Sequence, residues 1–348
     1  MRWDNLSAPP DEAGSERAAP AAPPLPLALP GAVTRTFDTP GFAGMTFHEV
    51  RAKSIINRVP GASRVPFEWT INPYRGCSHA CVYCFARHTH TYLDLDAGAD
   101  FDRQVIVKVN AGELVRRELA APRWRGAPVA MGTNVDCYQR AEGKYQLMPQ
   151  IIAALRDFAN PFSILTKGTL LLRDLPLLRR VAEVTRVSLA YSVGFVDEAL
   201  WRAVEPGAPS PRRRLAAVRA LTDAGFSVGV LMAPVLPGLS DDEASIDATV
   251  SAIAAAGAAS VTPLALHLRP GAREWFARWL GREHPHLVPR YRDLYRAGAY
   301  APQAYQRELA ARVRIAARRH GLLRAGAGEG RRSVAEPGPP PAEQLTLL

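Results

Sequence analysis

Six short apolar runs, each followed by an amphipathic stretch, restrict the fold of this chain more than any other feature of its sequence. The runs are FEWTI (67–71), PVAMGT (128–133), FSILT (162–166), RVSLAYS (186–192), FSVGVLMAP (226–234) and SVTPLAL (260–266). Buried strands joined by crossover helices pair in parallel. The pattern therefore predicts an α/β fold on a parallel sheet, either doubly wound or curved as a barrel, with its chemistry on the loops after the strands.

Helical periodicity fills the segments between and after these runs. The clearest helices are expected at 111–120, 147–159, 210–225 and 241–257, the last opening with Ser240 and acidic residues in its first turn. After the sixth run the pattern becomes helical, and 302–321 is its strongest element. This predicts a C-terminal helical extension over residues 271–324.

The two ends of the chain differ in composition from the rest. Residues 8–31 are dominated by Pro and Ala and lack aromatic residues, and 325–343 repeat that composition. Such segments bury too little apolar surface to offset the entropy of ordering. We therefore expect a disordered leader over 1–44 and a flexible tail over 325–348.

The overall composition is that of a globular protein, with 47% hydrophobic and 22% charged residues. No stretch approaches 18 uninterrupted apolar residues, and the chain opens without the pattern of a secretory signal. The sequence therefore predicts a cytoplasmic protein without a membrane span.

Three of the four cysteines lie in one short segment after the first predicted strand. Cys77, Cys81 and Cys84 have the spacing C-x3-C-x2-C, which favours reduced, metal-binding thiols over a disulfide framework. A structural zinc site needs four ligands, and His79 or Cys137 could complete one. Three thiolates on a four-iron cluster instead leave one iron open, which can bind and reduce a cofactor.

This segment resembles a known family of enzymes. NPYRGCSHACVYCFAR (72–87), with Tyr83 just before the third cysteine, resembles the cluster loop of the radical S-adenosylmethionine (SAM) superfamily. Together with GTNVDCYQRAEG (132–143), ILTKGTLLLRD (164–174) and the segment 205–241, it is similar to spore photoproduct lyase-like proteins, often labelled DNA repair photolyases.

The resemblance covers roughly residues 45–270 and carries several expectations. It implies a partial (β/α)6 TIM-like barrel and a 4Fe-4S cluster bound by Cys77, Cys81 and Cys84. It also implies reductive cleavage of SAM to methionine and a 5′-deoxyadenosyl radical, which abstracts hydrogen from the substrate.

SAM-binding residues are expected at the ends of the strands. Tyr83 beside the cluster can stack or hydrogen-bond near the adenine. Lys167 ends the third run in a chain with only four lysines, and the resemblance implies contact with the SAM carboxylate or ribose. The resemblance also implies a place near SAM for Ser192 and for backbone groups of Ala233.

Polar groups after the second run complete the expected SAM site. Asn134 and Asp136 are candidate ligands, and Glu142 in the same loop offers a carboxylate for the ammonium or the ribose hydroxyls. Superfamily members often carry a Gly-Gly-Glu-like turn here, and Gly132-Thr133-Asn134 departs from it, which leaves the ammonium ligand open. Cys137 does not align with the hydrogen-donor cysteine of photoproduct lyases, and we predict that it is inert. No catalytic residue is assigned.

The charge of the chain permits a nucleic-acid partner. Basic residues number 43 against 33 acidic residues, which gives a net charge of +10. Arg212–Arg214 and the Arg-rich segment 312–332 are candidate phosphate contacts, although a general bias toward Arg explains them equally well. No aromatic-interleaved platform for single strands is evident in the sequence.

The last residues suggest a further partner. Gln344, Leu345, Leu347 and Leu348 belong to a pentapeptide that resembles the peptides bound by the bacterial DNA sliding clamp. A tethered peptide of this kind would bring the protein to replicating DNA.

The sequence thus predicts a radical SAM enzyme that acts on a nucleic-acid or DNA-lesion substrate and receives electrons from a reductase, flavodoxin or ferredoxin. Two alternatives stay open. One is the same chemistry on a protein or a small molecule, and the other is a non-catalytic, metal-stabilised module that docks on the clamp. Steep salt dependence of DNA binding favours the nucleic-acid substrate. Zinc in place of iron favours the non-catalytic module.

Overall fold

The computed structural model describes residues 31–60 and 65–322, and its larger sheet has seven strands in the order β11-β10-β9-β8-β7-β4-β3. These strands are β3 (Ile56–Arg58), β4 (Trp69–Ile71), β7 (Val129–Met131), β8 (Phe162–Thr166), β9 (Val187–Ser192), β10 (Val228–Val235) and β11 (Ser260–Ala265). From β4 to β11 neighbouring strands pair in parallel, while β3 pairs antiparallel with β4. The carboxyl ends of six strands therefore meet at one edge.

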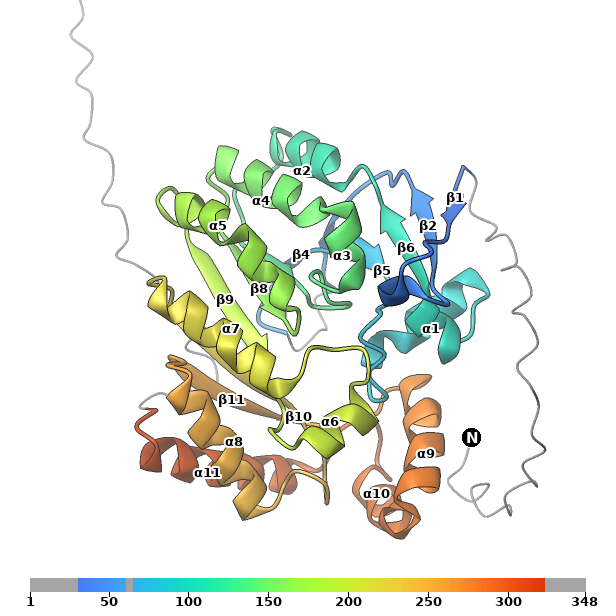
Figure 1. Ribbon diagram of the computed structural model, residues 1–348, viewed down its shortest axis with the longest axis vertical. Helices are drawn as coiled ribbons and strands as arrows, with labels where there is room; N and C mark the ends of the chain where they lie inside the picture. Colours follow the sequence, from blue (N-terminus) through green and yellow to red (C-terminus); the bar gives the residue numbers. More distant parts are fainter. Residues whose placement is uncertain (1–30, 61–64, 323–348) are drawn as a thin grey trace, which may run out of the picture.

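Helices cover this sheet, and Figure 1 shows α2, α4, α5, α7 and α8 following one another around it. The longer helices are α2 (Ala111–Leu119), α4 (Leu147–Asp157), α5 (Leu175–Ala182), α7 (Pro211–Asp223) and α8 (Glu243–Ala255). Each turns apolar residues inward, as Ile151 and Leu155 of α4 illustrate by being fully buried. Among the described residues, no helix is both long and apolar enough to cross a membrane.

The predicted α/β fold is confirmed. Each of the six apolar runs overlaps one of the parallel strands from β4 to β11. The reason is burial: Val228, Val230 and Met232 on one face of β10 are buried, and the residues between them are half-buried. Within the described residues the sheet stays open, with β3 and β11 as its edges, and it does not close into a barrel.

A second sheet, which the sequence pattern did not reveal, lies beside the first. Its four strands have the order β1-β2-β6-β5. They are β1 (Val33–Arg35), β2 (Thr46–Val50), β5 (Tyr74–Arg75) and β6 (Gln104–Lys108). β1 and the 3-10 turn η2 (Pro40–Phe42) fall within the expected leader, so the prediction of disorder is wrong for residues 31–44. Residues 1–30 lie outside the described part of the chain.

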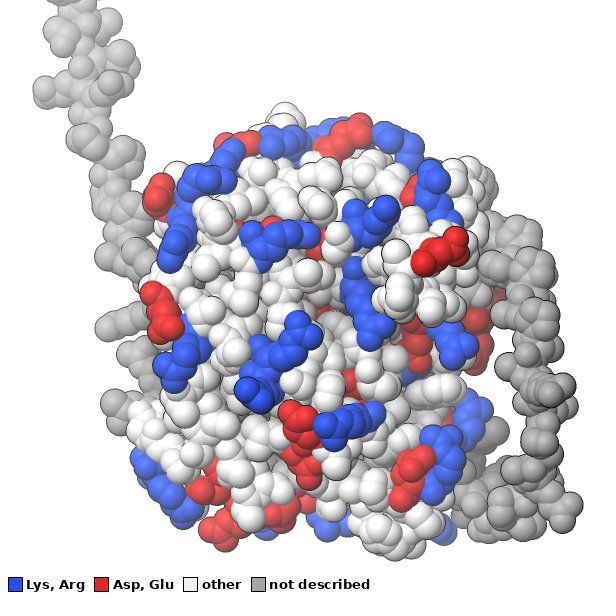
Figure 2. Space-filling view, in the orientation of Figure 1, with Lys and Arg blue, Asp and Glu red and all other residues white. Residues whose placement is uncertain are grey.

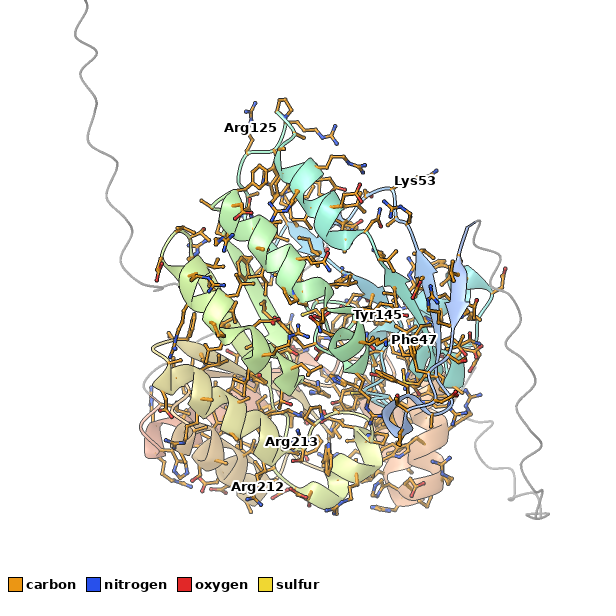
Figure 3. The ribbon with its side chains drawn as sticks, turned by 45° about the horizontal axis from the view of Figure 1, so that its top comes forward. Phe47, Lys53, Arg125, Tyr145, Arg212 and Arg213 are labelled. Atoms are coloured by element: carbon orange, nitrogen blue, oxygen red, sulfur yellow. The ribbon has the colours of Figure 1, made fainter. Side chains whose placement is uncertain are left out.

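Aromatic packing explains why this N-terminal segment is ordered. The ring of Phe47 in β2 is fully buried and lies 5.3 Å from that of Phe42 and 5.7 Å from that of Tyr145 at the end of α3 (Arg140–Tyr145). Figure 3 shows Phe47 and Tyr145 next to each other. Contacts between residues this far apart in the chain leave no periodic signal in the sequence.

The helices expected after residue 270 are present. They are α9 (Ala272–Glu283), α10 (Val288–Leu294) and α11 (Gln303–Arg319), and α8 packs on α11. The expected tail 325–348, the clamp-like residues Gln344, Leu345, Leu347 and Leu348, and the end of the Arg-rich segment lie outside the described residues.

Side-chain caps mark the starts of α7 and α8 at the carboxyl edge. The Ser210 hydroxyl accepts a hydrogen bond from the Arg213 amide, at 3.3 Å, and Pro211 takes the first position of α7. For α8 the expected start at Ser240 is wrong, because Asp242 caps the helix by accepting from the Ser245 amide at 2.9 Å. Ser240 instead accepts from the Leu236 amide within the preceding loop.

Candidate functional site

The cysteine segment begins directly after β5, the short strand of the second sheet that follows the carboxyl end of β4. Cys77 and Cys81 are buried, Cys84 is half-buried, and all three thiols are free. Backbone hydrogen bonds fix the loop, since the Cys77 amide donates to the Phe101 carbonyl at 2.9 Å and the Val82 amide donates to the Val204 carbonyl at 3.0 Å. The thiols therefore belong to a braced loop.

The protonation of these thiols is governed by burial. Burial raises the pKa of Cys77 well above its usual range and raises the pKa of Cys81 to about 12, and it also raises the pKa of Cys84. A buried thiol loses its proton only when a cation takes the place of that proton, and in proteins this cation is usually a bound metal centre.

Arg87 stabilises the cysteine loop through hydrogen bonds, and the sequence analysis did not identify it. Its side chain is fully buried and donates to the Cys81 carbonyl at 2.9 Å and to the Gly98 carbonyl at 2.8 Å. It also pairs with Asp102 at 2.8 Å and stacks 4.9 Å from the Trp275 ring of α9. Only its place three residues after Cys84, in CFAR, hinted at this role.

The donor set fits an iron-sulfur cluster. Three free thiols within one short loop supply three ligands and leave a position for another group on a four-iron cluster. In the described ranges, no three His, Cys, Asp or Glu side chains converge on a single ion. Thiolates that bind separate irons need not converge, whereas the zinc alternative with His79 or Cys137 does require convergence.

The ends of β8, β9 and β10 are joined by hydrogen bonds between side chains that the sequence singled out. The Lys167 ammonium donates to the Ser192 hydroxyl at 2.9 Å, and this hydroxyl donates to the Ala233 carbonyl at 2.8 Å. The Lys167 ammonium also lies 5.7 Å from the centre of the Tyr83 ring. Four of the predicted SAM-binding residues are therefore neighbours at one edge.

A buried ion pair supports this group and was missed. Glu205 is fully buried, accepts hydrogen bonds from the Tyr83 hydroxyl and the Arg214 guanidinium, and lies 3.8 Å from the Lys167 ammonium. Arg214 also donates to the Ser192 carbonyl at 3.0 Å. Burial alone would raise the pKa of Glu205, but Arg214 and Lys167 hold it below its ordinary value. Glu205 is therefore an anion that keeps two cations in place.

Asp136 takes a positioning role in this structure. Its carboxylate accepts from the Thr166 hydroxyl and from the Lys167 amide, both at 2.6 Å, and lies 3.5 Å from the His79 ring nitrogen. Burial lowers the pKa of His79 to about 4, so its imidazole is neutral at pH 7. Asn134 lies half-buried in the loop after β7, two residues before Asp136. Direct contact of either residue with SAM stays a prediction.

Glu142 does not have a free carboxylate. It is fully buried and accepts from the Tyr74 hydroxyl, from Arg173 and from the amides of Leu147 and Met148 at 2.5 to 3.1 Å. The expectation that it binds the SAM ammonium is therefore wrong, because these donors occupy both oxygens and tie α3 to α4. Cys137 is fully buried in the hydrophobic core.

Gly207 is required where the Glu205 loop meets the cysteine loop. A Cβ on Gly207 would lie 2.0 Å from the Ser78 carbonyl oxygen, and the Gly207 amide already donates to the His79 carbonyl at 3.0 Å. We expect Gly207→Ala to displace the cysteine loop, to lower the free energy of unfolding by about 1–3 kcal/mol and to reduce iron uptake on reconstitution. Urea unfolding and iron assays measure both effects.

The control for this substitution is Gly281→Ala. Gly281 lies inside α9, and apart from its chain neighbours and its own helix backbone no atom would lie within 4 Å of an added Cβ. Alanine there should stabilise the helix by about 0.5–1 kcal/mol and leave iron uptake unchanged. Equal iron uptake by the Gly207 and Gly281 variants would contradict the role given to Gly207.

Comparison with known proteins identifies the family of this chain. Residues 71–248, just over half of the chain, match the family model of the radical SAM superfamily. An uncharacterized protein of Mycobacterium tuberculosis is 53% identical over 82% of this chain and 85% of its own. An uncharacterized protein of Methanocaldococcus jannaschii is 28% identical over 58% of this chain and 72% of its own.

Solved structures of spore photoproduct lyase have a similar fold. One, in complex with dinucleoside spore photoproduct, superposes with a TM-score of 0.61 at 16% identity and covers 79% of each chain. Another, with bound SAM and the same dinucleoside, has a TM-score of 0.60 at 16% identity and covers 78% of each chain. The cysteine loop, the fold and the family match lead to one conclusion: the chain belongs to the radical SAM superfamily.

Proposed function

We propose that this enzyme cleaves SAM reductively at a 4Fe-4S cluster held by Cys77, Cys81 and Cys84, and that it acts on a nucleic acid, most specifically on a damaged base in DNA. The observation that carries the proposal is the meeting of the cysteine loop with the linked strand ends of β8, β9 and β10. Such an arrangement brings an electron source and a binding site for a charged cofactor to the same edge.

When bound, the cluster supplies the electron that splits SAM into methionine and a 5′-deoxyadenosyl radical. Lys167 offers a cation for the SAM carboxylate, and Ser192 offers a hydroxyl beside it. Glu205 holds Lys167 and Tyr83 in place, and Asp136 holds the backbone of Lys167. The Tyr83 ring and the Ala233 backbone are assigned to the adenine, and the Asn134 amide to the ammonium or ribose.

A curved, incomplete barrel of six parallel strands belongs to this proposal. β4 and β11 lie at opposite ends of the parallel set. Even so, Phe85, which follows the cysteine loop after β4, contacts Arg269, which follows β11, with the guanidinium 5.4 Å from the ring centre. Contact between these two segments supports curvature at the carboxyl edge.

Exposed arginines near this edge support a polyanionic substrate. Arg212 and Arg213 occupy the first turn of α7, where Figure 3 shows them together, and Arg140 opens α3 and reaches toward the Gly207 carbonyl. On the face of the molecule drawn in Figure 2, basic side chains are spread widely, with acidic ones among them. Net charge alone therefore does not define a binding site. The fold shared with a lyase that binds a dinucleoside photoproduct adds support.

The test is anaerobic turnover of the reconstituted full-length protein with SAM, dithionite and DNA. Ultraviolet-irradiated and undamaged DNA are compared, 5′-deoxyadenosine is quantified, and the nucleosides are analysed by mass spectrometry. We expect product formation to rise with irradiated DNA and a lesion to disappear. Stimulation by neither irradiated nor undamaged DNA would contradict the proposed DNA substrate and favour a protein or small-molecule substrate.

Binding provides a separate prediction. In a plot of log affinity against log salt concentration, Arg212→Ala combined with Arg213→Ala should make the slope shallower by roughly 2, because about two phosphate contacts are lost. The control is Arg180→Ala on α5, an exposed arginine away from the carboxyl edge, which should keep the slope. Equal slopes for all three proteins would remove these arginines from the interface.

A further inference from the structure

Four residues from three separate segments form one partly exposed cluster beside the cysteine loop, which we call the rim platform. They are Phe85, His267, Arg269 and Tyr300. The Arg269 guanidinium lies 5.4 Å from the centre of the Phe85 ring and donates to the Tyr300 hydroxyl at 3.0 Å. The His267 ring lies 4.7 Å from the Tyr300 ring, and an antiparallel bridge joins these two residues.

The platform presents aromatic surface to solvent. Phe85 is 36% exposed and Tyr300 is 38% exposed, and in the described ranges only Tyr92 and Phe158 are other aromatic residues exposed to this degree. Each residue therefore keeps roughly a third of its surface accessible, while the rest packs within the protein. Exposed rings that are held around a guanidinium are typical of a recognition surface.

The place of the platform ties it to the reaction site. Phe85 directly follows Cys84, and His267 and Arg269 follow the end of β11 at the carboxyl edge of the sheet. A ligand ring on this platform would therefore lie beside the cysteine loop. No other exposed aromatic group of the described chain adjoins one of the three cysteines in sequence.

The charges of the platform select its ligand. Arg269 is a permanent cation at its centre, so a cationic ligand such as a methylated lysine is repelled. Burial, together with Arg269, lowers the pKa of His267, which leaves a neutral ring at pH 7. Proteins that bind single-stranded nucleic acid stack unpaired bases on aromatic side chains, and nearby arginines contact the phosphate backbone.

We infer that the rim platform stacks an unpaired nucleobase of the substrate strand beside the cysteine loop. This inference rests on the proposed nucleic-acid substrate and deepens it. It implies that the substrate is single-stranded or locally opened, because a base within an intact duplex cannot offer its face. It also identifies a platform that the sequence could not reveal, since its members come from three separate segments.

The experiment uses the reconstituted full-length protein and a single-stranded oligonucleotide that contains 2-aminopurine. Affinity is measured by anisotropy, and stacking is measured by the quenching of the 2-aminopurine fluorescence. The variants are Phe85→Leu and Tyr300→Leu, and the second is used because it lies outside the cysteine loop. The matched control is Tyr92→Leu, on the same 3-10 helix as Phe85 (η3, Phe85–Leu93) and 75% exposed.

We expect both platform variants to bind about tenfold more weakly and to lose most of the quenching, while the control keeps both. An oligonucleotide with an abasic site in place of the reporter base should bind wild type and platform variants alike. If wild type binds and the platform variants match it, or if the control weakens equally, the platform assignment is wrong and the proposed function stands. If wild type binds duplex DNA but not the single-stranded oligonucleotide, the inference is wrong and the proposed function stands. If wild type binds neither of them at any salt concentration, the proposed function fails and the inference with it.

Discussion

Replacement of Arg214 by methionine is expected to lower the free energy of unfolding by about 3–5 kcal/mol, because it leaves the Glu205 carboxylate buried without its main partner. Both side chains of the pair are almost fully buried, so solvent cannot compensate. Arg214 also donates to the Ser192 carbonyl, and its loss should therefore loosen the Lys167 and Ser192 contacts. Urea unfolding followed by circular dichroism measures the first effect, and SAM binding measures the second.

Two controls separate the ion pair from a general effect of the substitution. Arg180→Met, on the exposed face of α5, should change stability by less than about 0.5 kcal/mol. In Glu205→Gln combined with Arg214→Met, no charge is stranded, so the double variant should be more stable than Arg214→Met alone. If the double variant loses the sum of the two single losses, the residues are independent and the pair does not support the site.

The pH dependence of the pair follows from the lowered pKa of Glu205. Its folded-state pKa lies below the ordinary value of 4.5, so the pair contributes its stability above that pH. The contribution is lost as the pH falls through the lowered folded-state value. The difference in stability between wild type and Arg214→Met should therefore shrink toward acidic pH.

The parallel strands were predictable because burial determines both their sequence and their place. A strand with one buried and one half-buried face favours a nearly continuous apolar run, and β8 to β11 supply such runs. Since parallel strands end at one edge, the adjacency of Lys167, Ser192 and Ala233 also followed from their positions at strand ends. Topology alone was sufficient for this part of the site.

The second sheet and the buried charges were not predictable for a different physical reason. β2 and β6 pair in parallel across more than fifty residues, and each has only five residues, so neither gives a local signal of its partner. Arg87, Glu205 and Arg214 resemble surface residues in sequence, and only tertiary packing shows that they are buried. The saturation of Glu142 was not predictable because its four donors come from three separate segments.

Loss of any one of the three loop cysteines should abolish SAM cleavage. Wild type reconstituted without oxygen should hold about four irons per chain. Cys77→Ala, Cys81→Ala and Cys84→Ala should each lose the cluster, because the two remaining thiolates are too few to retain it. We expect 5′-deoxyadenosine formation to fall by at least about 10³-fold, since the cluster is the source of the electron. Iron and sulfide assays, electron paramagnetic resonance of the reduced protein and chromatography of the nucleoside measure these effects.

The fourth cysteine provides the matched control. Cys137 is fully buried in the core, away from the loop in sequence, and Cys137→Ala removes a thiol without removing a proposed ligand. It should keep the irons and the nucleoside product, with only a modest loss of stability from the lost packing. A chain that keeps four irons and its activity without Cys81 would refute the assigned ligand set. A chain that loses both in Cys137→Ala would show that the fourth thiol is a ligand, as the zinc-type arrangement requires.

Zinc bound in place of iron by anaerobically prepared wild type would favour a structural module, because zinc has no redox chemistry and cannot supply the electron.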